Sequence, residues 1–140
     1  MYATVADMIT RFDAEELLEL SDPDGAGTIG QAIVEAALSD ASYEIDSYLG
    51  RYKLPLPETP QVLRRYCCEI ARYFLYKGSA PERVQTAYDD AKDWLTKLST
   101  GKVTLQINGT DVVTEAPAAE NTILFDGPER VFSRQSMRGF

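Results

Sequence analysis

The feature that most constrains the fold of this chain is the helical spacing of its apolar residues. This spacing continues through the first hundred positions and then stops. In the clearest stretch, at about 81–99, apolar residues recur every three or four positions, as on one face of a helix. After Gly101 the period changes to that of a strand, and a polar tail follows. We therefore predict a mainly α protein, with a helical domain at about 1–100 and a β-hairpin and extended arm at about 101–140.

Capping signals mark the starts of the predicted helices. Thr4 precedes the first helix, and Asp13, with Glu16 three residues later, forms a capping-box-like pattern for the second. Thr59 followed by Pro60 opens the fourth, since proline is tolerated at the first helical position. These signals divide the domain into a bundle of about four to five helices.

Glycines mark the ends of the longer helices. A third helix is expected at about 28–49 with Gly50 as its C-terminal cap, the fourth ends at Gly78, and Gly101 stops the fifth. Alanines on the buried face of the third helix would let a partner helix approach closely. The expected buried faces of the first and third helices comprise Val5, Met8, Ile9, Ile29, Ala32, Ile33, Ala36, Ala37, Ala41, Ile45, Tyr48 and Leu49.

A β-hairpin is expected directly after the helices. Residues 103–107 alternate apolar and polar side chains, Asn108 and Gly109 give a strong tight-turn signal, and 111–114 return as the second strand. A lone hairpin is only marginally stable in water, so we expect this one to pack on the helices or to extend a neighbour's sheet. Residues 115–120 have the composition of a linker.

Composition limits the function classes. With 140 residues there is room for one domain with a real core. The net charge of −8 has the wrong sign for a general DNA-binding surface, although it leaves room for a local basic patch. The chain has no histidine and no recognisable catalytic constellation, so we do not expect an enzyme. With neither an apolar run of about 20 residues nor a signal-peptide pattern, no membrane partner is expected.

Residues 22–29 resemble the start of an EF-hand calcium loop, with Asp22 and Asp24 at the first and third loop positions. The fifth position is Ala26 and the twelfth is Ile33, so ligand oxygens are missing where the loop needs them. An ordinary turn feeding a helix is therefore favoured over a weak calcium-binding module. We expect no metal site and no cofactor.

Cys67 and Cys68 are adjacent on a predicted helix, where neighbouring side chains diverge by about 100°. No histidine is available to complete a soft-metal site, so buried, reduced thiols are expected, as in a cytosolic protein. The carboxylates of Asp40, Glu44 and Asp46 lie within two turns of one helix. A solvated acidic face is favoured there over general acid–base work.

Arginines and tyrosines mark candidate binding surfaces on the helices. Arg64 and Arg65, with Arg72 two turns on, form the densest basic stretch of the helical part, either an interfacial ion-pair surface or a solvated helix face. Most tyrosines are expected to fill the core, and those left exposed would be interface anchors. The tyrosines considered are Tyr43, Tyr48, Tyr52, Tyr66, Tyr73, Tyr76 and Tyr88.

The tail is predicted to dock on another molecule. It carries Arg130, Phe132, Arg134, Arg138 and Phe140. Arginine and aromatic residues are enriched at binding hot spots, whereas disordered segments are usually poor in aromatics. We therefore favour docking over a frayed terminus.

Several segments resemble one family. They are residues 1–4 (Met-Tyr-Ala-Thr), the Asp7-Met8 pair, residues 45–52 (Ile-Asp-Ser-Tyr-Leu-Gly-Arg-Tyr) with 54–56 (Leu-Pro-Leu), and the ending 130–134 with Gly139-Phe140. In them the chain resembles the Mu-like phage and prophage family of small head-proximal proteins, over nearly its whole length. It is more distantly similar to the helical head–tail connector, or adaptor, proteins of long-tailed phages, which form rings under the portal vertex of the capsid.

The resemblance implies a structural neck protein, an adaptor subunit that assembles as a ring between portal and tail in a virion built in the bacterial host cytoplasm. It implies as partners further copies of the chain, the portal and tail-completion proteins, while DNA passes through the lumen without specific binding. A net charge of −8 suits a lumen wall that repels DNA. A DNA-packaging accessory or regulatory module that binds nucleic acid through Arg64, Arg65 and Arg72 is the alternative.

Overall fold

The structure is a computed structural model and describes residues 1–77, 79–107 and 110–111. This part of the chain holds five helices and two short strands. They are α1 (Val5–Arg11), α2 (Ala14–Ser21), α3 (Gln31–Tyr48), α4 (Gln61–Leu75), α5 (Glu82–Ser99), β1 (Gln106–Ile107) and β2 (Thr110–Asp111). The predicted mainly α fold with about five helices is confirmed, while the expected arm lies outside the described residues.

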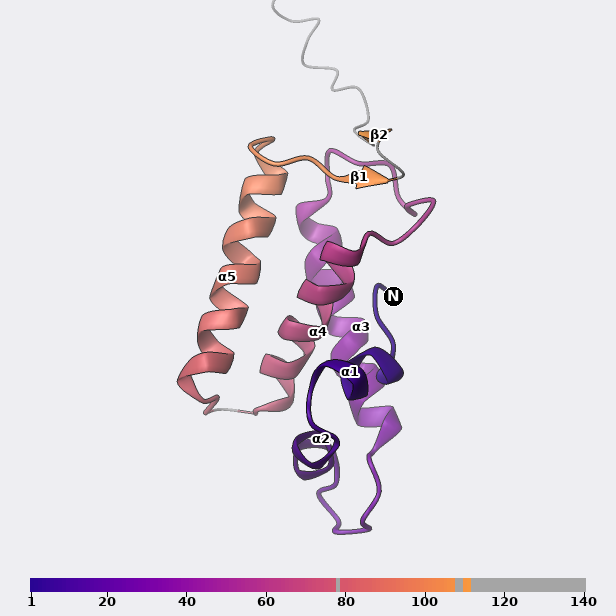
Figure 1. Cartoon of the computed structure of the whole chain (residues 1–140), viewed down its shortest axis with the longest axis vertical. Coiled ribbons are helices and arrows are strands. Elements are labelled where there is room, and N and C mark those ends of the chain that lie inside the picture. The colour runs from indigo at the N-terminus through magenta and orange to yellow at the C-terminus, as the bar shows by residue number, and fades with distance from the viewer. Residues whose placement is uncertain (78, 108–109, 112–140) are drawn as a thin grey trace, which may run out of the picture.

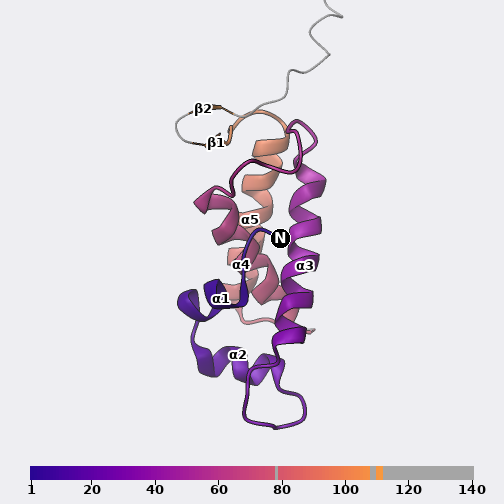
Figure 2. The ribbon, with the colours of Figure 1, turned by 90° about the vertical axis from the view of Figure 1, so that its right-hand side faces the viewer.

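The three long helices form the body of the molecule. α4 lies between α3 and α5, which form the two edges of the group (Figure 1). α1 and α2 pack against α3 and close the end of the molecule opposite the strands (Figures 1 and 2). Helices and the segment before β1 all contribute to one core. Its large, fully buried side chains include Met8, Leu17, Leu38, Ile45, Leu49, Leu63, Ile70, Leu95, Leu98 and Leu105.

The start of α1 is capped as predicted, but that of α2 is not. Thr4 Oγ1 accepts a hydrogen bond from the Asp7 N–H (3.2 Å), and the Asp7 carboxylate accepts one from the Thr4 N–H (2.8 Å). Asp13 stands at the N-cap of α2 without a side-chain cap hydrogen bond. The predicted capping box is wrong because Glu16 directs its carboxylate to Arg72 instead.

α3 begins three residues later than predicted, with Gly30 at its N-cap. The Gly30 N–H donates to Ser21 Oγ (3.0 Å), and a side chain at position 30 would collide with the Ser21 carbonyl. The chain therefore turns tightly against the end of α2 before the helix starts. The stripe predicted for α3 was too wide, since Ala32 and Ala36 are exposed, as is Ile9 on α1.

Three other predicted boundaries also differ from the structure. Leu49, not Gly50, is the C-cap of α3, and its N–H bonds to the Asp46 carbonyl (3.0 Å). α4 has Pro60, not Thr59, at its N-cap and ends at Leu75, before Gly78. Prolines tend to hold the segment before α4 extended, so the first helical turn begins only after Pro60.

Gly101 ends α5 as predicted. Its N–H donates to the Leu98 carbonyl (3.2 Å) and the Lys102 N–H donates to the Lys97 carbonyl (2.9 Å), which together make a Schellman motif. The φ angle of Gly101 is +85°, in the left-handed region. A Cβ at this position would also collide with the guanidinium of Arg51. Both the turn and the close approach therefore require glycine.

The predicted hairpin is confirmed but is shorter than expected. β1 and β2 pair antiparallel, with Gln106 opposite Asp111 and Ile107 opposite Thr110. Residues 103–105 precede the strand, and the Leu105 N–H donates to the buried hydroxyl of Tyr52 (3.1 Å). Leu105 therefore anchors the start of the hairpin in the helical core. Residues 112–114, predicted as strand, lie outside the described residues.

Gly101→Ala should destabilise the protein by about 1–2 kcal/mol, because alanine must adopt a positive φ there and must displace Arg51. The measurement is the free energy of unfolding in urea, followed by far-ultraviolet circular dichroism. Gly50→Ala is the matched control, since its Cβ would meet nothing within 4 Å and its φ is not left-handed. Equal stability of the two variants would contradict this account of the α5 terminus.

Candidate interaction surfaces

The three predicted arginines of α4 lie in different surroundings. Arg64 Nε is 4.0 Å from Asp7 on α1, an ion pair too long for a hydrogen bond. Arg65 is exposed, with its guanidinium over the Tyr66 ring at 5.4 Å from the centroid. Arg72 is only 8% exposed. These side chains therefore do not form the continuous basic patch on which the nucleic-acid alternative depends.

Arg72 ties α4 to α2. Its Nε and Nη2 donate to the two carboxylate oxygens of Glu16, at 2.9 and 2.8 Å, and the Tyr76 hydroxyl donates to Glu16 Oε1 at 2.6 Å. The guanidinium also lies over the Phe12 ring, 4.5 Å from its centroid. A two-pronged arginine–carboxylate pair fixes direction as well as distance. This cluster therefore sets how α2 sits on the bundle.

The cluster also shifts the pKa of Glu16. Burial opposes ionisation, but the hydrogen bonds from Tyr76 and Arg72, together with the Arg72 charge, outweigh it and lower the pKa of the Glu16 carboxyl. Burial and the same carboxylate raise the pKa of the Tyr76 hydroxyl. The cluster lines an open groove of about 770 Å³. Arg72, one of the predicted interface residues, thus makes its main contacts within its own chain.

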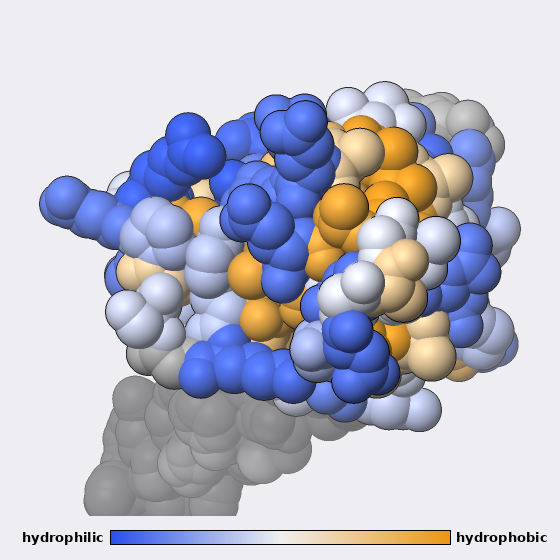
Figure 3. Space-filling model, turned by 90° about the horizontal axis from the view of Figure 1, so that it is seen from below, coloured by the Kyte–Doolittle hydropathy of each residue, from blue (hydrophilic) through white to orange (hydrophobic). Residues whose placement is uncertain are grey.

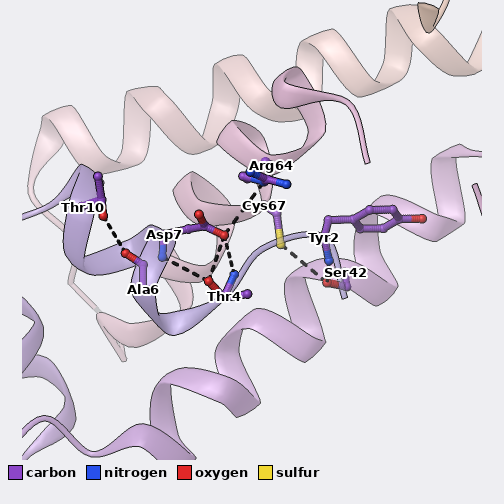
Figure 4. A network of polar contacts seen from close by, with 8 residues as sticks. All are labelled: Tyr2, Thr4, Ala6, Asp7, Thr10, Ser42, Arg64 and Cys67. Atoms are coloured by element: carbon purple, nitrogen blue, oxygen red, sulfur yellow. Dashed lines mark hydrogen bonds and ion pairs between the residues drawn. The ribbon is translucent and has the colours of Figure 1, made fainter. Parts of the chain in front are cut away.

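The N-terminal segment is fixed between α3 and α4 (Figure 4). The Tyr2 N–H donates to Ser42 Oγ on α3 (3.2 Å), and Ser42 Oγ lies 3.5 Å from Cys67 Sγ on α4. The Tyr2 hydroxyl donates to Asp46, which is also on α3. The next residue, Ala3, is buried. Residues 2 and 3 are therefore part of the core packing rather than a free end.

A groove runs between α4 and α5. Its volume is about 330 Å³, and its aromatic wall is formed by Tyr66 and Trp94, whose ring centroids are 5.0 Å apart. Arg65 stands at its edge. Glu69 also lines it, and the Oε2 atom of this residue is covered yet has no hydrogen-bond partner within the described residues. We name this feature the α4–α5 groove; its lining is completed by Ala87, Asp90, Asp93 and Lys97.

The outer face of α3 offers a different surface. Tyr43 is 69% exposed there, and the neighbouring Ala36 and Asp40 are exposed as well. α3 and α5 form opposite edges of the group of long helices (Figure 1), and no residue of α3 lines the α4–α5 groove. Tyr43 is the exposed one of the seven tyrosines considered above, and an exposed tyrosine is expected to be an interface anchor. The molecule thus carries two unlike side surfaces.

The end of the molecule that holds α2 presents a third surface. Apolar side chains gather across the middle of this face, with polar side chains around them (Figure 3). An open hollow of about 400 Å³ between α2 and the C-terminal end of α4 includes Leu20, Pro23 and Leu75 in its lining. Contiguous apolar patches rimmed by polar residues are typical of binding surfaces.

The sequence matches a known protein family over most of its length. The family model described as "Bacteriophage Mu, Gp36" matches residues 2–123. The chain belongs to this family. It is 37% identical to the Mu-like prophage FluMu protein gp36 of Haemophilus influenzae, with 100% of this chain and 98% of the relative covered. It is 34% identical to gene product J of Escherichia phage Mu, with 99% and 98% covered.

Membership of the Gp36 family identifies a phage-related protein and confirms the resemblance seen in the sequence. In the part of the chain that the structure describes, no helix combines the length and apolar character needed to cross a bilayer. The predicted arm residues Arg130, Phe132, Arg134, Arg138 and Phe140 lie outside that part. Their role in docking stays a prediction.

In the loop that resembles the start of an EF-hand, the Asp22 carboxylate binds the backbone of the loop itself. Asp22 Oδ1 accepts from the Ala26 N–H (2.8 Å) and Asp22 Oδ2 from the Gly27 N–H (2.7 Å), so both oxygens stabilise a turn. Among the described residues no group of three or more metal-ligating side chains converges. The cysteines are buried as predicted, and burial raises the pKa of the Cys68 thiol to about 12.

Sequence reasoning missed how several carboxylates are used. The expected solvated acidic face is wrong for two of its three members, because Glu44 accepts from the Tyr88 hydroxyl (3.2 Å) and Asp46 accepts from that of Tyr2. These partners are more than 40 positions away, so no local pattern predicts them. Glu69 and Trp94 were also missed as site residues, because each fits an ordinary helical pattern.

Glu16→Gln should destabilise the protein by about 1–3 kcal/mol at pH 7, since the buried Arg72 loses its charged acceptor. The folded pKa of Glu16 lies below its ordinary value of 4.5. Its contribution is therefore complete above pH 4.5 and is lost as the pH falls through the folded pKa. Urea unfolding at a series of pH values should show the difference between wild type and variant shrinking below pH 4.5.

Glu15→Gln on the same helix is the control for this series, because Glu15 is exposed and makes no contact with Arg72. A Glu16→Gln penalty that stays constant down to pH 2 would contradict the assigned role of the carboxylate.

Proposed function

We propose that this protein is a head–tail connector subunit, one copy of a ring that joins the portal to the tail in a Mu-like phage or prophage particle. Its membership of the Gp36 family over nearly the whole chain supports a role in such a particle. The mechanism is assembly, in the virion neck, and involves no reaction.

The observation that carries the proposal is the pair of unlike side surfaces at opposite edges of the helical body. A closed ring is built by repeating one head-to-tail contact, which needs two different, complementary patches on each subunit. The exposed Tyr43 face of α3 supplies one patch, and the exposed edge along α5, onto which the α4–α5 groove opens beside Arg65, Tyr66 and Trp94, supplies the other. Tyrosine, tryptophan and arginine are the residues most enriched at interface hot spots.

A connector also needs contacts along the ring axis, because it bridges two different partners. The apolar end at α2 and the hairpin at the other end of the molecule are available for such contacts (Figures 1 and 3). A two-stranded hairpin is marginally stable alone and gains from pairing with a further strand. We propose that one of these two ends binds the portal and that the other binds a tail-completion protein.

The charge of the chain suits a channel through which DNA slides. With a net charge of −8, a ring of these subunits repels the phosphate backbone rather than holding it. The α4 arginines do not form a continuous patch that would reverse this locally. DNA then passes through the lumen without specific binding, and we do not retain the nucleic-acid-binding alternative.

Deletion of residues 127–140 should prevent ring formation while the helices stay folded, because the helices bury a shared core of their own that includes Leu38, Leu63 and Leu95. Light scattering over a concentration series should give a large, discrete multiple of the 15.6 kDa chain mass for the full chain and a monomer for the truncated chain. Far-ultraviolet circular dichroism should be unchanged apart from the removed segment. A truncated chain that assembles as the full chain does would contradict this mechanism.

A further inference from the structure

We propose that the α4–α5 groove is the receptor for the C-terminal arm, residues 130–140, of a neighbouring copy of this chain. This inference rests on the proposed function, because the arm adds a second contact, within the groove, between one ring subunit and the next. Three features support it: the chemistry of the groove, the spacing of the arginines in the arm, and the length of the chain that connects the arm to the hairpin.

The groove has the chemistry that binds an arginine side chain. Trp94 offers an aromatic face, on which a guanidinium stacks favourably, as Arg65 already does over the neighbouring Tyr66 ring. Glu69 offers a carboxylate whose Oε2 has no hydrogen-bond donor in the described part of the chain. A covered oxygen without a donor is costly, and a guanidinium that enters beside it would satisfy it. Asp90, exposed at the groove's edge, adds a second negative charge.

The groove has a net charge of −1, because Glu69, Asp90 and Asp93 are negative while Arg65 and Lys97 are positive. The Lys97 ammonium is 2.7 Å from the Asp93 carboxylate, so this pair neutralises itself. Arg65 lies over the Tyr66 ring, on α4. A second open hollow, lined by Glu82, Arg83, Thr86, Ala87 and Asp90, shares its last two residues with the groove. Together the two hollows make a track along the exposed side of α5.

The arm has matching chemistry. Arg130, Arg134 and Arg138 recur every fourth residue, a spacing that places all three on the same side of either a helix or an extended strand. Phe132 and Phe140 supply apolar groups beside them. In such a segment, one arginine can stack on the wall formed by Tyr66 and Trp94 while the others pair with the carboxylates along α5.

The connecting chain is long enough to reach a neighbour. The residues that join β2 to the arm, 112–129, can span up to about 60 Å when extended. α5, with 18 residues, is only about 27 Å long. An arm that leaves its own subunit at the hairpin can therefore reach the groove of the next subunit in a ring.

The test measures arm binding separately from ring formation. The receptor is the full chain with Arg130, Arg134 and Arg138 changed to glutamine, so that its own arm does not compete. Fluorescence anisotropy of a labelled peptide of residues 127–140 gives the affinity. Trp94, the single tryptophan of the chain, reports the place of binding through its emission.

We expect saturable binding with a change in Trp94 emission. Glu69→Gln or Asp90→Asn in the receptor, or glutamine in place of the three peptide arginines, should each weaken binding by roughly tenfold or more. Glu15→Gln on α2 is the control and should have no effect, because Glu15 is exposed and lies outside both the α3 face and the groove. Absence of binding, or binding that none of the groove variants weakens, would overturn the proposal. If Glu69→Gln fails to fold, Asp90→Asn still tests the groove, because Asp90 is exposed and its replacement should not disturb the core.

Dilution of the native chain decides which copy supplies the arm. If a neighbour supplies it, quenching of Trp94 by acrylamide should rise as the oligomer dissociates. Quenching that stays constant on dilution, while the peptide still binds the groove, would show docking within one chain and overturn the assignment to a neighbour. Peptide binding at the groove without any portal-bound ring would leave this contact standing while the proposed function fails.

Discussion

Burial of α4 between α3 and α5 is the constraint on which the rest of the structure depends. Leu63, Cys67, Ile70 and Ala71 on this helix are fully buried, and each large apolar side chain contributes about 1.5–3 kcal/mol on leaving water. Side chains of α4 hold α2 through Arg72, form one wall of the aromatic groove through Tyr66, and support through Cys67 the Ser42 hydroxyl that binds the N-terminal segment. A change in the rotation of α4 would therefore disturb all three at once.

The elements that the sequence predicts well are those with local causes. Thr4 caps α1 through a residue three positions away, and Gly101 ends α5 because a left-handed residue is needed at that point. Glu16 was misassigned for the opposite reason. Its spacing from Asp13 fits a local cap, but Arg72, 56 positions away, binds its carboxylate more strongly. Gly30 likewise delays α3 through a contact with Ser21 that no helical period contains.

The candidate surfaces depend on packing that the pattern of a single helix does not contain. Tyr43 was not singled out among the tyrosines, because Ala36, seven positions earlier on the same face of α3, was expected to be buried and is exposed. The α4–α5 groove was not predicted either, since it depends on Tyr66 and Trp94 meeting across two antiparallel helices. Of the predicted arginines, Arg65 is exposed beside that groove, whereas Arg72 serves the fold. Residue type does not distinguish these arginines, and only the packing shows that Arg65 is exposed and that Arg72 binds Glu16.

The central claim is that this chain is a ring subunit that sits on the portal. The most direct test is the mass of the complex formed when the full chain is added in excess to the purified portal of the same phage or prophage. The account predicts a single discrete complex that exceeds the portal mass by many whole multiples of 15.6 kDa. A portal that binds no copies, or a single copy, would contradict it.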